Sequence, residues 1–222
     1  MFDKIFYINL PNRSDRNKNI IKQLNKLKLS DITERIKALV GTKLDINAIS
    51  SNLITDKGKK DALSDFRMDS TYLTKGSIGC ALSHRKIYKK MVSEDIACAL
   101  ILEDDVTINN NNFTNFINSK NTLVKDHQQY IPKNYDILFV GYHDDCIKYQ
   151  SPSKHFYTRS SVVLGTFGYI VTKKGAQKML DLFPISRQLD TEIFLNFNKI
   201  NAYVLLPDKR FVKSANFGTD TQ

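Results

Sequence analysis

The stretch ACALILEDDV, residues 97–106, runs six apolar residues directly into three consecutive acids, Glu103, Asp104 and Asp105. A continuous apolar run of this length is typical of a strand that is buried on both faces of a sheet. Three carboxylates about 5 Å apart would repel one another by roughly 3 kcal/mol per pair at an effective dielectric constant of about 20. A strand that ends in this way therefore needs a cation beside its acids.

The other apolar segments indicate the class of fold. YDILFVG at 135–141 is a second continuous strand, while KIFYINL at 4–10 and AYVLL at 202–206 are shorter ones. Apolar residues recur at helical spacing between the strands, as in the helix expected over about 74–92. Strands that alternate with helices predict an α/β fold with a mixed, mostly parallel sheet flanked by helices.

The remaining elements follow from the same patterns. They are a helix after the polar turn 11–16, a strand at 35–40, a helix at 112–125, a strand at 162–171, a helix at 173–183 and a helix at 190–199. The stretch 41–70 is polar and weakly patterned, so we expect loops and short helices there. The sequence contains no internal repeat and no linker-like segment, and residues 1–222 are expected to form a single domain.

Composition narrows the class of function. The chain is 41% hydrophobic and 25% charged, as is usual for globular proteins. Its longest apolar run, 96–102, is far shorter than the roughly 20 residues that a membrane helix needs, and its first residues do not resemble a signal peptide. Three cysteines without a CxxC pair fit a reducing compartment, so we expect a cytoplasmic protein.

The formal net charge of +10 would suit nucleic acid, an anionic membrane face or a phosphorylated ligand. The lysines are scattered among many asparagines and isoleucines, which also fits a general compositional bias. Nucleic-acid binding ranks last among these readings, because no recognised motif and no platform of arginine and aromatic residues accompanies the charge.

The acidic triplet lies at the carboxyl end of its strand, where ligands bind in open α/β sheets. Alternation along an extended chain would point Glu103 and Asp105 the same way and Asp104 the opposite way. Two aligned carboxylates suit Mg²⁺ or Mn²⁺, and an ion held by few protein groups keeps positions open for diphosphate oxygens. The alternative is that the acids cap the next helix or pair with surface lysines.

The phosphate-binding motifs that are missing narrow the ligand further. The sequence contains neither GxxxxGK[ST] nor a GxGxxG after its first strand. The sequence therefore lacks the phosphate-binding loops of kinases, GTPases and dinucleotide-dependent oxidoreductases, which argues against these three classes. A nucleoside diphosphate-sugar remains as the ligand that a divalent cation would help to hold.

Four segments that together cover most of the chain carry a family resemblance. They are IFYINLPNRSDR, the Ser-His helix GSIGCALSHRKIYKKM, the acidic motif ALILEDDV, and the Gly-Thr segment GTFGYIVTKKGAQKML. In this order they resemble glycosyltransferase family 25, which includes bacterial lipooligosaccharide galactosyltransferases and relatives in collagen glycosylation. Two segments depart from the family pattern, QLDTEIF and the final FGTDTQ, and they leave the catalytic base and the acceptor side open.

The resemblance implies a GT-A type nucleotide-diphospho-sugar transferase fold. It also implies an inverting transfer of a hexose, galactose before glucose, from a UDP-sugar with Mn²⁺ or Mg²⁺ as the cofactor. The expected acceptor is a hydroxyl of a surface glycan or glycolipid such as lipooligosaccharide, reached by peripheral contact with an anionic membrane face. The alternative is a catalytically silent GT-A module that binds a nucleotide or a glycan.

The donor side has the larger set of candidate residues. Asp105 is the first choice as metal ligand, and Asp104 is expected either to face the ribose or to cap a helix. Arg16 either reaches the donor or is solvated on the helix that follows the first strand. His84 either bonds the donor or the triplet, or is structural. The full set comprises Glu103, Asp105 and Asp220 for the metal, and Asn9, Leu10, Arg13, Ser83, His84 and Asp104 for the donor.

The acceptor side needs a carboxylate that removes the proton of the attacking hydroxyl. Asp190 is the first candidate for this base and Glu192 is the alternate. Both lie at the start of a predicted helix, where an acid also serves as an ordinary cap. Gly165, Thr166 and Tyr169 are expected to line the acceptor side.

Overall fold

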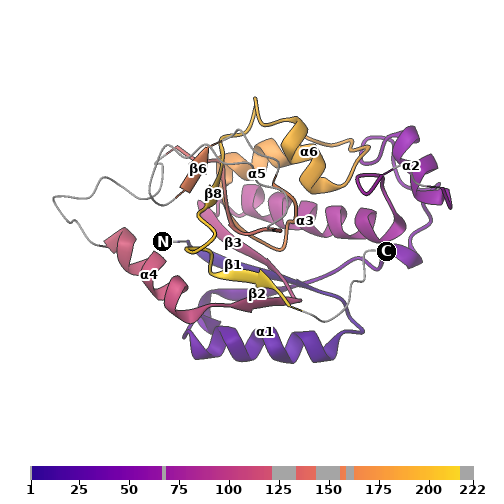
Figure 1. Ribbon diagram of the computed structural model, residues 1–222. Helices are drawn as coiled ribbons and strands as arrows, with labels where there is room; N and C mark the ends of the chain where they lie inside the picture. Colours follow the sequence, from indigo (N-terminus) through magenta and orange to yellow (C-terminus); the bar gives the residue numbers. More distant parts are fainter. Residues whose placement is uncertain (1, 67–68, 122–133, 144–155, 159–162, 216–222) are drawn as a thin grey trace.

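A computed structural model describes residues 2–66, 69–121, 134–143, 156–158 and 163–215. These residues form a seven-stranded sheet with the order β2-β1-β3-β7-β5-β8-β6 (Figure 1). Five of the strands run in one direction, while β6 and β7 run against them. The strands of this sheet are β1 (Lys4–Asn9), β2 (Thr33–Lys37), β3 (Cys98–Glu103), β5 (Ile137–Gly141), β6 (Phe156–Thr158), β7 (Gly168–Thr172) and β8 (Ala202–Leu205).

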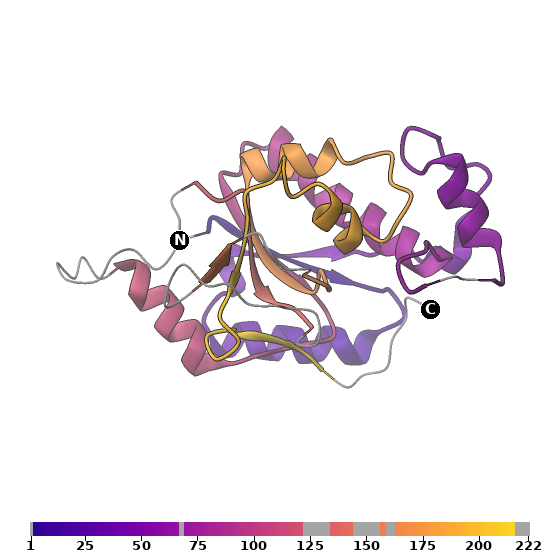
Figure 2. The ribbon, with the colours of Figure 1, turned by 45° about the horizontal axis from the view of Figure 1, so that its top comes forward.

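Helices cover both faces of the sheet, as the two ribbon views show (Figures 1 and 2). One face carries α1 (Ser14–Lys26), and the other carries α3 (Lys75–Ser93) and α5 (Lys173–Leu180). The other helices are α2 (Asp56–Leu63), α4 (Asn110–Asn121) and α6 (Leu189–Leu195), with short 3-10 turns at η1 (Ser30–Ile32) and η2 (Gly41–Lys43). Within the described ranges, every helix is too short or too polar to cross a lipid bilayer.

The continuous apolar strands are explained by these two layers. Successive side chains of a strand point to opposite faces, and in β3 Ile101 packs in the cluster on the α3 side while Leu100 and Leu102 pack with α1. In β1 the same division separates Phe6 from Ile5. Because both faces are buried, the middle of each strand is apolar on both sides. The expected α/β fold with a mixed, mostly parallel sheet flanked by helices is confirmed.

Parallel pairing brings the polar ends of two strands together. β1 and β3 are neighbours in register, with Ile8 opposite Glu103. The turn after β1 and the acidic residues after β3 therefore lie at the same edge of the sheet. α3 begins at this edge with a capping box, in which Thr74 Oγ1 accepts from Ser77 N at 2.9 Å and Ser77 Oγ accepts from Thr74 N at 2.7 Å.

Some boundaries and elements differ from the predictions. β2 ends at Lys37 rather than at residue 40, because the chain leaves the sheet and the N–H of Leu39 donates to Ser83 Oγ on α3 at 2.9 Å. Beyond the main sheet, β4 (Val106–Ile108) pairs antiparallel with β9 (Val212–Ser214). Strands of three residues are too short to be predicted from the sequence pattern. The stretch 41–70 contains the expected short helices, η2 and α2.

Two glycines bring the segment after β2 into contact with α3. A side-chain carbon at Gly79 would lie 2.5 Å from the carbonyl oxygen of Leu39, and one at Gly41 would lie 1.9 Å from that of Lys75. Such distances exclude any side chain at these positions without movement of the backbone. The segment 38–42 is thus fixed against the first turns of α3.

Candidate functional site

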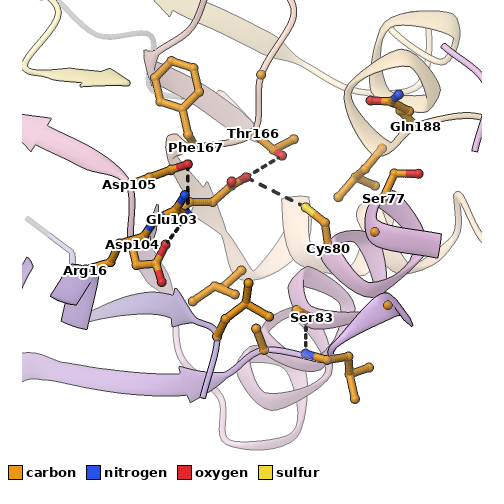
Figure 3. A pocket seen from close by; sticks show the side chains of 18 of the residues that line it. Arg16, Ser77, Cys80, Ser83, Glu103, Asp104, Asp105, Thr166, Phe167 and Gln188 are labelled. Carbon is orange, nitrogen blue, oxygen red and sulfur yellow. Dashed lines mark hydrogen bonds and ion pairs between the residues drawn. The ribbon is translucent and has the colours of Figure 1, made fainter. Parts of the chain in front are cut away.

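A cavity of about 570 Å³ lies where the carboxyl ends of β1 and β3 meet the start of α3. Its walls come from the turn after β1, the segment 38–42, the first turns of α3, the acidic triplet, residues 165–167 and the start of α6. Figure 3 shows the triplet at one side of this cavity and Cys80 and Ser77 of α3 at the other. The cavity therefore occupies the position at which open α/β sheets bind their ligands.

Charge is unevenly distributed over the cavity wall. Glu103, Asp104, Asp105 and Asp190 line it, and among the described lining residues Arg16 is the one arginine or lysine. Four carboxylates against one guanidinium leave an excess of negative charge in a recessed site. Like charges at this density are tolerated when a cation or a hydrogen-bond donor offsets them.

Arg16 is the cation that the acidic triplet needs. Its side chain is 3% exposed, and Nη1 lies 3.2 Å from Oδ1 of Asp104 and 3.4 Å from Oδ2 of Asp105. The sequence allowed two interpretations of Arg16, and the one that placed it in solvent on the helix surface is therefore wrong. The other oxygen of Asp104 accepts from Asn9 Nδ2 at 2.5 Å, so both oxygens of Asp104 are engaged within the protein.

The triplet does not alternate as an extended strand would. β3 ends at Glu103, and Asp104 and Asp105 belong to a turn. Glu103 consequently points toward α3, whereas Asp104 and Asp105 share Arg16 of α1 (Figure 3). The predicted common orientation of Glu103 and Asp105 is therefore wrong, because the strand geometry on which it depended stops one residue earlier.

Glu103 receives its partners on one oxygen. Oε1 accepts from Thr166 Oγ1 at 3.0 Å, lies 3.3 Å from His84 Nε2, and lies 3.9 Å from Cys80 Sγ. Burial would raise the pKa of Glu103, but the hydrogen bonds from His84 and Thr166 outweigh it and hold the pKa below its usual value. Glu103 is thus a carboxylate with one oxygen fixed by the protein.

Asp105 experiences the opposite balance. Burial, followed by the negative charge of Glu103, raises the pKa of Asp105 to about 7. Its side chain is 22% exposed, and the 3.4 Å distance to Arg16 is long for a strong ion pair. In the absence of a further cation, Asp105 therefore takes up a proton at about neutral pH.

Two carboxylate oxygens at the cavity remain available to a divalent cation. Within the described residues, Oε2 of Glu103 and Oδ1 of Asp105 receive no hydrogen bond from another residue, and both side chains line the cavity. Carboxylate oxygens are the ligands that Mg²⁺ and Mn²⁺ prefer. Cys80, His84 and Glu103 also have ligand atoms within 4.8 Å of one another. Burial raises the pKa of the Cys80 thiol well above its usual value, which disfavours that second set.

The candidates for the catalytic base have different surroundings. Asp190 lines the cavity, and its Oδ2 accepts from Gly165 N at 2.8 Å. Gly165 has a φ of +98°, a conformation that favours glycine. Glu192 does not line the cavity; it is 9% exposed, and its Oε1 accepts from the N–H groups of Ser186 and Arg187 at 2.8 and 2.9 Å.

Several predicted residues lie at the cavity and others do not. Leu10, Ser83, Gly165 and Thr166 line it together with the acids described above. Arg13 pairs with Asp15 instead of reaching the cavity. Asn9, His84 and Tyr169 are fully buried behind the wall, so the expectation that Tyr169 lines the acceptor side is wrong. Asp220 lies outside the described residues.

His143 and Gln188 also line the cavity, and the sequence indicates the first of them but not the second. His143 directly follows the strand YDILFVG and a tyrosine, so its position after the carboxyl end of β5 was the available signal. Gln188 gave no such signal, because it is brought in by contacts with distant residues. Its N–H donates to Thr71 O at 3.0 Å.

Comparisons with known proteins agree on one family. The family model described as "Glycosyltransferase family 25 (LPS biosynthesis protein)" matches residues 2–193. The chain is 27% identical over 201 residues to procollagen galactosyltransferase 1 of Danio rerio. It is 30% identical over 203 residues to a Homo sapiens protein named inactive glycosyltransferase 25 family member 3. Both alignments cover 87% of this chain but 31% of the relative, so the chain spans about a third of the length of these relatives.

A solved structure is similar at a lower level. It is a glycosyltransferase involved in the glycosylation of the major capsid of PBCV-1, with a TM-score of 0.47 and 9% sequence identity. The match covers 98% of this chain and 94% of that one.

We predict that Arg16→Met destabilises the protein strongly. The substitution keeps the volume but leaves Asp104 buried without its cation, which typically costs about 3–5 kcal/mol in the free energy of unfolding. Urea denaturation measures the loss. Arg13→Met is the matched control, three residues earlier, because its partner Asp15 is exposed and such pairs contribute little. Equal losses in the two variants would contradict the assigned role of Arg16.

A second prediction concerns pH. With a pKa raised from 3.8 to about 7, folded Asp105 holds a proton that the unfolded chain has lost. The free energy of unfolding should therefore fall as pH rises between about 4 and about 7. Asp105→Asn lacks this titration, so in buffer with a metal chelator it should gain stability relative to the natural chain across that range. A difference that is independent of pH would show that Asp105 titrates normally.

Proposed function

The chain belongs to glycosyltransferase family 25, and from that premise we propose that it transfers a hexose from a UDP-sugar to a hydroxyl of a surface glycan. Galactose is the proposed sugar before glucose, and lipooligosaccharide is the proposed kind of acceptor. The observation that supports this proposal best is the excess of carboxylates in the cavity at the ends of β1 and β3. A site of that charge suits a donor that arrives with a divalent cation.

The donor is proposed to bind across the triplet. Glu103 and Asp105 would hold Mn²⁺ or Mg²⁺ through the oxygens that the protein leaves without partners, and the cation would stabilise the negative charge of the departing diphosphate. Ile8, Leu10 and the segment 38–42 form a less polar wall beside it. This wall is the proposed place for the uracil ring, with backbone groups available for hydrogen bonds.

Asp190 is the proposed base of an inverting transfer. The acceptor hydroxyl attacks the anomeric carbon, the bond from that carbon to the diphosphate breaks, and the hydroxyl proton passes to the Asp190 carboxylate. The bond from Gly165 N orients Oδ2 without using all of its lone pairs. Glu192 is a weaker candidate, because its side chain does not line the cavity.

The names of the relatives support the sugar and the kind of acceptor to different degrees. Procollagen galactosyltransferase 1 favours galactose, while the family description favours a lipopolysaccharide-type acceptor. The net charge of +10 fits an anionic acceptor or peripheral contact at the cytoplasmic face of a membrane. The relative named inactive, 30% identical, keeps a catalytically silent nucleotide- or glycan-binding module as the alternative.

Release of UDP tests the proposal and separates it from the alternative. We expect UDP-galactose to raise the melting temperature only with Mn²⁺ or Mg²⁺, and the chain then to release UDP slowly by hydrolysis. GDP- and CDP-sugars are the matched controls. Asp105→Asn should abolish both effects because it removes a carboxylate from the proposed cation site. Stabilisation without release of UDP would indicate the silent module, and no metal-dependent stabilisation by any UDP species would refute the proposal.

The base is tested by two isosteric variants. Asp190→Asn removes the base and retains an oxygen that can accept from Gly165 N, while its amide nitrogen replaces the oxygen that accepts from Thr191 N at 2.8 Å. Transfer to an acceptor sugar should fall by about 10²-fold or more, with donor binding unchanged. Glu192→Gln likewise retains an acceptor for Ser186 and Arg187, and its rate should stay within a few-fold of the natural chain. The reverse order of effects would identify Glu192 as the base.

A further inference from the structure

A chain of buried polar side chains extends from Glu103 into the core. His84 Nε2 lies 3.3 Å from Oε1 of Glu103, and His84 Nδ1 lies 2.7 Å from the hydroxyl of Tyr169. That hydroxyl lies 2.5 Å from the hydroxyl of Tyr88. His84, Tyr169 and Tyr88 are each 0% exposed and none of them lines the cavity. No contact of theirs with a substrate is therefore available.

The direction of these hydrogen bonds is set at the Glu103 end. An ionised carboxylate only accepts, so Nε2 of His84 must donate to it. In the neutral tautomer that carries its proton on Nε2, Nδ1 accepts from the Tyr169 hydroxyl, whose oxygen in turn accepts from Tyr88. In that tautomer every donor of the series points toward the acidic triplet. The imidazole is held at both nitrogens, which fixes its tautomer and its orientation.

These hydrogen-bonded side chains lie in apolar surroundings, where buried hydroxyls cost free energy unless they are satisfied. Tyr88 and Tyr169 lie in the apolar cluster between α3 and the sheet, where Phe139 lies 6.1 Å from the Tyr169 ring. Phenylalanine would fill the same space without hydroxyls that must be satisfied. The hydroxyls are fully used only because they lead to His84 and so to Glu103.

We propose that Tyr88, Tyr169 and His84 are positioning residues that hold Glu103 for a divalent cation. Together with Thr166 and Cys80 they fix Oε1, which leaves Oε2 as the oxygen offered to the cavity. The inference rests on the proposed function in that the cation is the one assigned there to Glu103 and Asp105. Outer partners of metal ligands commonly change metal affinity by 10- to 100-fold when they are removed.

The experiment measures Mn²⁺ affinity by titration calorimetry without any donor, alongside the melting temperature. Tyr169→Phe keeps the ring and removes the hydroxyl that bonds His84, and the affinity for Mn²⁺ should fall roughly tenfold. Tyr142→Phe is the matched control, because its buried hydroxyl donates to Leu205 O at 2.6 Å and is not a member of the series that leads to Glu103. This control should lose stability but keep its Mn²⁺ affinity.

Two substitutions of His84 distinguish the contributions of its two ring nitrogens. A glutamine amide reaches about as far as Nε2, so His84→Gln can still donate to Glu103, whereas an asparagine amide takes the place of Nδ1. Mn²⁺ affinity should therefore fall further in His84→Asn than in His84→Gln. Donor hydrolysis by Tyr169→Phe should recover at saturating Mn²⁺, which a damaged fold would not allow.

The outcomes distinguish this inference from the proposed function. If the natural chain binds Mn²⁺ and Tyr169→Phe matches it within twofold, or falls no further than Tyr142→Phe, the positioning role is overturned while the enzyme proposal stands. If Tyr169→Phe binds Mn²⁺ about tenfold more weakly but the natural chain releases no UDP, the positioning role is supported and the transferase proposal fails. If the natural chain binds no Mn²⁺ without a donor, the positioning role is overturned, and the transferase proposal is decided separately by the metal-dependent stabilisation with UDP-galactose.

Discussion

The buried guanidinium of Arg16 is the interaction on which the end of β3 depends. It lies between Asp104 and Asp105 at 3.2 and 3.4 Å, and it is almost completely shielded from solvent. The parallel register of β1 with β3 makes this contact available, because the turn after β1 delivers the first residues of α1 to the acidic end of its neighbour. Without that register the strand could not end in three acids at an interior edge of the sheet.

One guanidinium does not neutralise the acidic triplet, and the three acids differ in how firmly the protein holds them. Both oxygens of Asp104 are bonded within the protein, to Arg16 and Asn9, so Asp104 has a structural role. Glu103 is fixed from the α3 side, while Asp105 is held less firmly from the α1 side. The two carboxylates that keep an oxygen without a partner are therefore held by helices on opposite faces of the sheet. Their separation is set by the packing of both helices on the sheet.

Much of this arrangement could be predicted from the sequence, and the reasons are local. The apolar run before Glu103 and the run 135–141 identify strands buried on both faces, and a polar end of such a strand indicates a ligand site. The orientation of each acid could not be predicted, because β3 ends at Glu103 and a turn replaces the alternation. The same limit applies to Tyr169, whose hydroxyl is directed by Tyr88 of α3, and to Glu192, whose carboxylate turns back onto the backbone at 186–187 before α6. A pattern in the sequence carries no information about partners that approach from another element.

The contact between Gly79 and Leu39 has a consequence for selectivity. The segment 38–42 touches α3 through backbone atoms at both Gly41 and Gly79, with no side chain between them that could rotate aside. A cavity wall fixed in this way keeps its position, unlike one formed by adaptable side chains. If a base packs against this wall, the wall cannot move back to admit a bulkier ring, so part of the discrimination between nucleobases would come from the main chain itself.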